Sequence, residues 1–304
     1  MPDLVFYEGN WVREVTYKRN EKRIRKLYKD AYQDINKKLK DLSGKTNISS
    51  AMERNRLTQL KHQVLEAYTD VGKNLETIIR DGMRTTAVGI VVDNQKFLSA
   101  CGVHIKGAMS HVPQDVVSRV VSGKVYHSSW SLSKAIWKDT QKIRTDINQI
   151  IAKGIAENKS AYDIGKELEK YVNPTAKKPW DWGKVYPGSK RVIDYNAQRL
   201  SRTLITHAYQ QSLVEVCRNN PYIKGLRWET SNSGRVCPIC LDRDGHIFPV
   251  DDCPLDHPNG MCTQIPVLDR SIEAISEDLA EKASEPLNNP DVEAWKEYMK
   301  SMSG

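Results

Sequence analysis

The sequence predicts a mainly α-helical protein, in which long helices and a helical hairpin precede a small β subdomain near the C-terminus. Three observations predict this class. Apolar residues recur every three or four positions over most of the chain before Pro221. Short segments of alternating polarity follow. Four of the six cysteines lie between residues 228 and 268, at spacings typical of metal ligands, so we expect the β subdomain to be a zinc-knuckle β-hairpin.

Composition bounds the class of protein. With 304 residues, 39% hydrophobic and 28% charged, the chain can form one large or two ordinary domains. Its net charge of +8 permits an anionic partner such as double-stranded DNA, although the basic residues are spread along helices in a way that favours solvated faces. No apolar run is long enough to span a membrane, and the N-terminus lacks a signal-peptide layout. We therefore expect synthesis in the cytoplasm, where clustered cysteines are more often ligands than disulfides.

The first two helices are expected to form a hairpin. Apolar positions between residues 17 and 42 fall on one stripe, and Ser43-Gly44 supplies a stop. Ser50 and Glu53 match a capping box, and a 3/4 apolar rhythm follows for more than five turns. The short link predicts antiparallel packing, within the hairpin or onto a partner helix. Residues 84–112 contain β-branched residues and glycine and fit either a helix or a buried strand.

Helical rhythm resumes at Pro113, which suits the first position of a short helix ended by Gly123. A longer helix is expected over residues 131–157. Ser160 and Asp163 form a second capping pair, which predicts a short helix after a tight turn.

Two features bear on nucleic-acid binding. The turn before the short helix has helix-turn-helix spacing, but Glu167 and Glu169 stand where a DNA-reading helix needs donors, which favours a structural corner. The loop at residues 173–189 is long and rich in Pro and Trp, which is typical of a functional or mobile loop. Its aromatics either fold back onto the helices or face a partner or nucleic acid, and the weak candidates for that contact are Lys177, Lys178, Trp180, Trp182 and Lys184.

A last long helix is expected over residues 191–218, and short strands follow it. Residues 222–230 alternate apolar and polar side chains, which predicts a strand. Two further short strands are expected at residues 246–250 and 263–268. Such strands are marginally stable alone, and a structural zinc ion contributes on the order of 10–16 kcal/mol in small peptides, so a metal would order them.

The metal ligands are expected to be three thiolates and one imidazole. Cys237 and Cys240 form a Cys-x2-Cys turn that places two sulfurs on one side, and His257 and Cys262 return from the other direction. Cys253 is a reserve ligand that lies near enough in sequence to replace His257 or Cys262. Four protein ligands close the site to water, which predicts structural zinc. The alternative is that these cysteines are only buried thiols.

The order of these features resembles the minor head proteins of tailed bacteriophages, the Mu F-like head morphogenesis family. That family has a helical region and then W-x-T, a basic residue, C-x2-C, D-G and H-P-N-C-x-C. The matching residues here are Trp228-Glu-Thr230, Arg235, Cys237-Pro-Ile-Cys240, Asp244-Gly245 and His257-Pro-Asn-Gly-Met-Cys262, preceded by Arg202-Thr203 where the family carries Arg-Thr-Glu. The resemblance covers roughly half of the chain.

The resemblance implies a minor capsid protein that acts in head morphogenesis. Such proteins lie inside the virion, associate with the portal or with capsid or scaffold proteins, and assist head assembly and DNA packaging or delivery. Gly260 stands where the family has the first Cys of C-x-C, so the ligand set departs from the family. Leu204 replaces the Glu after Arg-Thr, which argues against an enzymatic role for that position.

The alternatives are a His-Asn-His-like metal-dependent nuclease and a DNA-binding protein. Asp256, His257 and Asn259 superficially resemble such a nuclease, but no histidine follows His257, and no deaminase signature is present. We therefore expect no enzyme. The chain is expected to divide into a hairpin region (1–110), a helical head-morphogenesis domain (111–221), the zinc-knuckle subdomain (222–270) and a helical tail (271–304).

Overall fold

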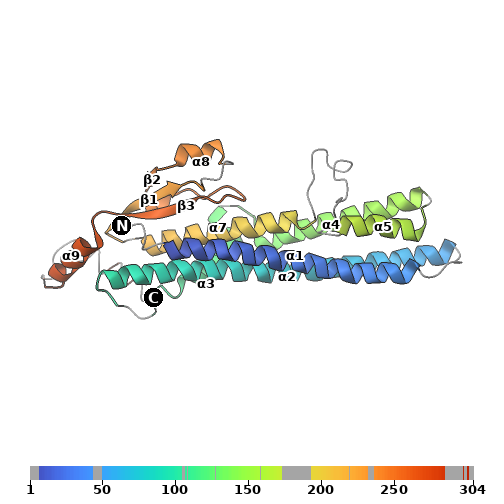
Figure 1. The fold of residues 1–304 in the computed structure, drawn as a ribbon, viewed down its shortest axis with the longest axis horizontal. Helices are drawn as coiled ribbons and strands as arrows, with labels where there is room; N and C mark the ends of the chain where they lie inside the picture. The colour runs from blue at the N-terminus through green and yellow to red at the C-terminus, as the bar shows by residue number, and fades with distance from the viewer. Residues whose placement is uncertain are drawn as a thin grey trace. The chain divides into compact units, whose positions relative to one another are not determined.

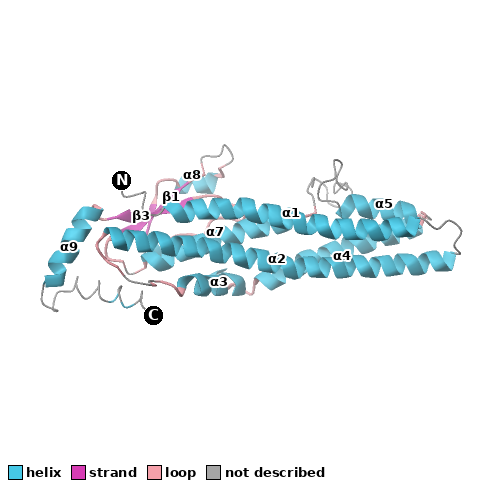
Figure 2. Cartoon of the chain, turned by 60° about the horizontal axis from the view of Figure 1, so that its bottom comes forward, coloured by secondary structure: helices cyan, strands magenta, loops and turns pink. Residues whose placement is uncertain are grey.

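The computed structural model describes residues 7–43, 50–104, 107, 109–126, 128–157, 159–172, 193–218, 220–231, 236–284, 297 and 300. Helix dominates this part of the chain, and strands are confined to residues 223–268 (Figures 1 and 2). This confirms the mainly α-helical prediction. Contacts divide the chain into two units. The first comprises Met1–Lys18, Arg80–Ser128 and Ser201–Gly304, and the second comprises Arg19–Ile79 and Ser129–Leu200. The four regions expected from the sequence stay a prediction.

Helix α1 (Tyr7–Ser43) begins ten residues before its expected start at Tyr17, because its first turns bury polar side chains that an apolar rhythm cannot detect. Helix α2 (Ser50–Ala100) continues through the β-branched stretch that also fitted a strand. In the first unit, Gly9 and Gly89 let these two helices approach closely. A Cβ at Gly89 would lie 3.3 Å from the Cα of Gly9. The glycines therefore serve helix packing here and do not interrupt the helices.

The shorter helices begin and end at the predicted signals. Helix α3 (Val112–Ser122) has a proline in its first turn and ends at Gly123, whose φ of 82° is left-handed. Helix α4 (Leu132–Ala156) is followed by α5 (Ala161–Val172), where the amide of Asp163 donates to the Ser160 hydroxyl at 3.1 Å. Helix α7 (Tyr195–Cys217), the short α8 (Pro238–Arg243) and α9 (Ile272–Ser284) follow, with one-turn 3-10 helices at Lys124–Tyr126 and Val250–Asp252.

The strands form a three-stranded antiparallel sheet, where the sequence predicted a hairpin. Its order is β2-β1-β3, with β1 (Ile223–Glu229) between β2 (Ile247–Phe248) and β3 (Thr263–Leu268). The sheet has three strands and not two because β1 also pairs with β3, over six residue pairs. Strand β2 is shorter than predicted because Pro249, which has no amide hydrogen, follows it.

A tryptophan anchors the core beneath the sheet. The Trp228 side chain is fully buried with Cys240 and Cys262, and Val236, Cys237, Phe248 and Cys253 pack around them. At Gly225, a Cβ would overlap the Phe248 carbonyl oxygen, so this glycine permits the close approach of β1 and β2. The sheet is thus built around the cysteine cluster.

Candidate metal centre

The first two cysteines of the cluster lie at the start of a short helix and not on an isolated turn. Helix α8 (Pro238–Arg243) has Cys237 as its N-cap and a proline in its first turn. The amide of Cys240 donates to the Cys237 sulfur at 3.4 Å. This bond holds both sulfurs on the same side of the turn, as expected for Cys-x2-Cys ligands.

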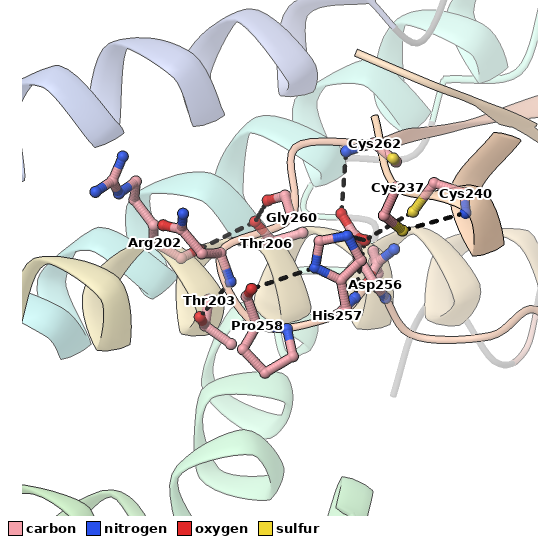
Figure 3. Close-up of polar contacts among 12 residues, drawn as sticks. Arg202, Thr203, Thr206, Cys237, Cys240, Asp256, His257, Pro258, Gly260 and Cys262 are labelled. Carbon is pink, nitrogen blue, oxygen red and sulfur yellow. Dashed lines mark hydrogen bonds and ion pairs between the residues drawn. The ribbon is translucent and has the colours of Figure 1, made fainter. Parts of the chain in front are cut away.

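All four predicted ligands lie together in two overlapping groups that share Cys240 (Figure 3). The first group contains Cys237, Cys240 and His257. The second contains Cys240, Asp256 and Cys262, and all three of these residues are buried. Within each group the donor atoms lie within 4.8 Å of one another. The structure therefore brings together the residues chosen from the sequence and adds Asp256, which had not been chosen as a ligand.

The remaining cysteines lie outside both groups. Cys253, the reserve ligand, packs against the Trp228 core, and burial raises the pKa of its thiol to about 11. The Cys101 and Cys217 thiols are buried, as core residues would be. Among the described residues these three cysteines belong to neither donor group.

Burial and hydrogen bonding act differently on the clustered thiols. Burial raises the pKa of Cys240, with the neighbouring sulfurs of Cys237 and Cys262 adding to the effect. Burial also raises the pKa of Cys262, and the Asp256 carboxylate raises it further. The Cys240 amide lowers the pKa of Cys237 by stabilising its thiolate.

The loop that carries Asp256 to Cys262 is fastened to α7. The Asp256 amide donates to Gln210 Oε1 at 2.9 Å, and His207 Nε2 lies 2.9 Å from the Asp256 carbonyl oxygen. Because a carbonyl oxygen only accepts, Nε2 carries the proton. The other ring nitrogen of His207 then accepts from the Tyr126 hydroxyl at 2.7 Å. The backbone at Asp256 is thus held from both sides.

Two threonines of α7 fasten the next part of the same loop. The Asn259 amide donates to the Thr203 hydroxyl at 2.9 Å, and the Thr206 hydroxyl lies 3.3 Å from the Gly260 carbonyl oxygen (Figure 3). The Arg202-Thr203 pair of the sequence motif therefore lies beside the cysteine loop. Leu204, which follows it, is buried in the core.

Arg13 of α1 is a contributor that sequence reasoning missed. Its guanidinium is buried and donates to the Cys262 carbonyl oxygen at 2.8 Å and to the Thr263 hydroxyl at 2.6 Å. It also lies over the Tyr209 ring, 4.5 Å from the centroid. No apolar pattern marks such a residue, so no signal in the sequence would have found it.

The donors suit zinc. Two sulfurs, an imidazole and a carboxylate lie around the buried Cys240 sulfur, and thiolate with imidazole is the set that zinc prefers. The only ion pair found for Asp256 among the described residues is with His257, whose Nε2 lies 3.9 Å away. Several anionic donors in one buried cluster are unfavourable unless a cation joins them. The residues present therefore fit a bound divalent cation.

The candidates for nucleic-acid contact, Lys177, Lys178, Trp180, Trp182 and Lys184, lie outside the described residues. None of the described helices has the length and apolar character needed to cross a bilayer.

Fold and site together define a helical protein with a C-terminal cysteine–histidine cluster mounted on a small sheet. Residues 141–264 match the family described as Phage Mu protein F like protein, which confirms the resemblance read from the motifs. The match ends within β3, just past Cys262. No match was found among curated proteins or among solved structures. The family suggests a role in head morphogenesis as a minor capsid component, with capsid-related partners and a place in the virion.

Proposed function

We propose that this protein is a phage minor capsid protein that associates with the portal or the inner capsid and assists head assembly and DNA packaging or delivery. In this proposal it carries a structural zinc ion and has no catalytic role. The ion is held by Cys237, Cys240 and Cys262, with His257 as the fourth ligand expected from the sequence. When bound, zinc would supply a cross-link between α8 and the Cys262 loop.

The family match carries this proposal, because it runs from α4 to β3 and so includes the whole cysteine cluster. The geometry supports a mechanical role for that cluster. The loop is fastened to α7 through Thr203, His207 and Gln210, and the sheet is joined to α1 through Arg13. A zinc ion with four protein ligands leaves no open position for a substrate or a water.

DNA is a partner in this proposal through the net charge of +8, which favours contact with a polyanion. Such contact would be largely independent of sequence, and its affinity would fall steeply as salt is raised. No described residue favours the nuclease alternative specifically.

The experiment that tests the proposal is affinity purification of the tagged full-length protein from infected cells, with Cys237→Ser and Cys101→Ser compared in parallel. Cys101→Ser is the matched control, since Cys101 lies outside both donor groups. We expect a portal or shell protein to co-purify with the wild type and with Cys101→Ser, and to be reduced with Cys237→Ser. A protein recovered free of head components, and cleaving DNA with a divalent cation, would refute the proposal.

A further inference from the structure

The cluster offers five donors, one of which is the shared Cys240 sulfur, but a structural zinc ion takes four. The donors are the sulfurs of Cys237, Cys240 and Cys262, the His257 ring and the Asp256 carboxylate. Structural sites are almost always four-coordinate and tetrahedral. One of the five therefore stays outside the coordination shell, and the two candidates for that position are Asp256 and His257.

Asp256 is enclosed at the centre of the cluster. Its side chain has no exposed surface, whereas 46% of the His257 side chain is exposed. One carboxylate oxygen accepts from the Cys262 amide at 3.0 Å, and the other accepts from the His257 amide at 2.8 Å. The second oxygen also lies 3.8 Å from the Cys240 sulfur. The carboxylate is thus held between Cys240 and Cys262.

Gly260 provides the space that the carboxylate fills. A Cβ at this position would overlap all three carboxylate atoms of Asp256. The φ of Gly260 lies outside the left-handed region, so the backbone itself does not demand glycine. The reason for a glycine here is therefore steric, because any side chain at 260 would enter the volume that Asp256 occupies.

His257 can lie outside the coordination shell, next to the ligands. Its Nδ1 lies 3.2 Å from the Pro258 carbonyl oxygen at the exposed edge of the loop. Its Nε2 lies 3.9 Å from the Asp256 carboxylate, within ion-pair range but beyond hydrogen-bond distance, and the His257 amide is the group that donates to this carboxylate.

We infer that Asp256 is the fourth zinc ligand, held between Cys240 and Cys262 in the space left by Gly260, and that His257 is an outer residue that positions it. The inference rests on the proposed zinc site and changes only its fourth ligand. The ion would be bound by three thiolates and one carboxylate oxygen, which gives the buried Asp256 carboxylate a cationic partner where the described residues show no ion pair to it from Lys or Arg.

The test is zinc affinity by chelator competition on the full-length protein, comparing Asp256→Asn with His257→Ala. Asparagine keeps the shape of the side chain and an acceptor oxygen, but it removes the anionic donor. We expect Asp256→Asn to lose more than about 100-fold in affinity, beyond the 10–100-fold typical of outer residues, and His257→Ala to lose less. A loss from Asp256→Asn no larger than that from His257→Ala overturns the inference.

A rescue variant tests the steric part. In the double variant Asp256→Ala with Gly260→Cys, the new thiol occupies the space vacated by the carboxylate. We expect zinc affinity to recover relative to Asp256→Ala alone, and the cobalt-substituted protein to show stronger sulfur-to-metal charge-transfer absorption as three thiolates become four. A folded double variant with no recovery, judged by circular dichroism, counts against the inference.

X-ray absorption on the zinc-loaded wild type needs no variant and keeps the inference testable if the variants fail to fold. We expect three sulfur scatterers and one light scatterer without the multiple scattering of an imidazole ring. An imidazole signal overturns the inference while leaving the proposed zinc site intact. A wild type that binds no zinc overturns the zinc site itself, so the two failures are distinguishable.

Discussion

Replacing Arg13 with alanine should destabilise the sheet that carries the cysteine cluster. Arg13 is buried in α1, yet it donates across about 250 residues of sequence to the Cys262 carbonyl oxygen and the Thr263 hydroxyl. The variant leaves this carbonyl oxygen without its donor and removes the cation from the face of Tyr209. Helix α1, which lies far from the knuckle in the sequence, would thus contribute to the stability of the sheet that carries the cysteine cluster.

The magnitude follows from competing contributions. A hydrogen bond to a charged group contributes about 1.5–3 kcal/mol, so the two long-range bonds together contribute about 3–6 kcal/mol. Alanine also relieves the desolvation of a buried guanidinium, which costs several kcal/mol, although stacking on Tyr209 offsets part of that cost. The net loss of unfolding free energy is therefore expected to be about 3 kcal/mol.

Urea unfolding of the full-length protein measures this loss, and hydrogen exchange of the β3 amides localises it. Arg13→Lys keeps the charge but not the planar fork and should fall between wild type and alanine. Lys18→Ala, an exposed position on the same helix, is the matched control and should change stability by less than about 0.5 kcal/mol. If Arg13→Ala lies within about 1 kcal/mol of wild type, with unchanged exchange in β3, the reasoning is wrong.

Three further predictions concern pH, capping and metal. Burial raises the pKa of Asp93 from 3.8 to about 6, against the lowering effect of the Gly9 amide, so stability present below pH 3.8 is lost as pH rises through 6. Asp93→Asn should flatten this dependence in melting curves, and an unchanged slope would exclude Asp93 as its source. Ser160→Ala should cost about 1 kcal/mol by removing the α5 cap, measured by thermal unfolding, and no change would show that the cap is dispensable. A chelator should lower the melting temperature of the zinc-loaded wild type but not that of Cys237→Ser, and equal responses would contradict a role for the cluster.

The helices were predictable where their buried faces are apolar. The capping signals at Ser160 and Gly123 correctly marked helix ends, because they depend on neighbouring residues alone. The first turns of α1 were missed because polar Arg13 and Thr16 occupy its buried face there. An amphipathic pattern depends on the contrast between apolar and polar faces, and a polar buried face removes that contrast.

The cysteine cluster was predictable from spacing, but Asp256 was not. The Cys-x2-Cys spacing places two sulfurs close together locally. His257 and Cys262 follow after a loop short enough to bring them back to these sulfurs. Whether the side chain of Asp256 turns inward depends on the anchoring of its backbone to Gln210 and His207 of α7, which is a tertiary contact. The signal in the sequence was Gly260, which stands where the family has a cysteine, but its steric role beside Asp256 is visible only in the structure.

The most direct measurement is the metal content of the purified full-length protein. Elemental analysis of wild type, Cys240→Ser and Cys101→Ser should find about one zinc ion per chain in the wild type and in Cys101→Ser, and a large loss in Cys240→Ser, whose sulfur belongs to both donor groups. A wild type that contains no zinc, or a Cys240→Ser variant that retains it fully, would contradict the assignment of this cluster as a structural zinc site.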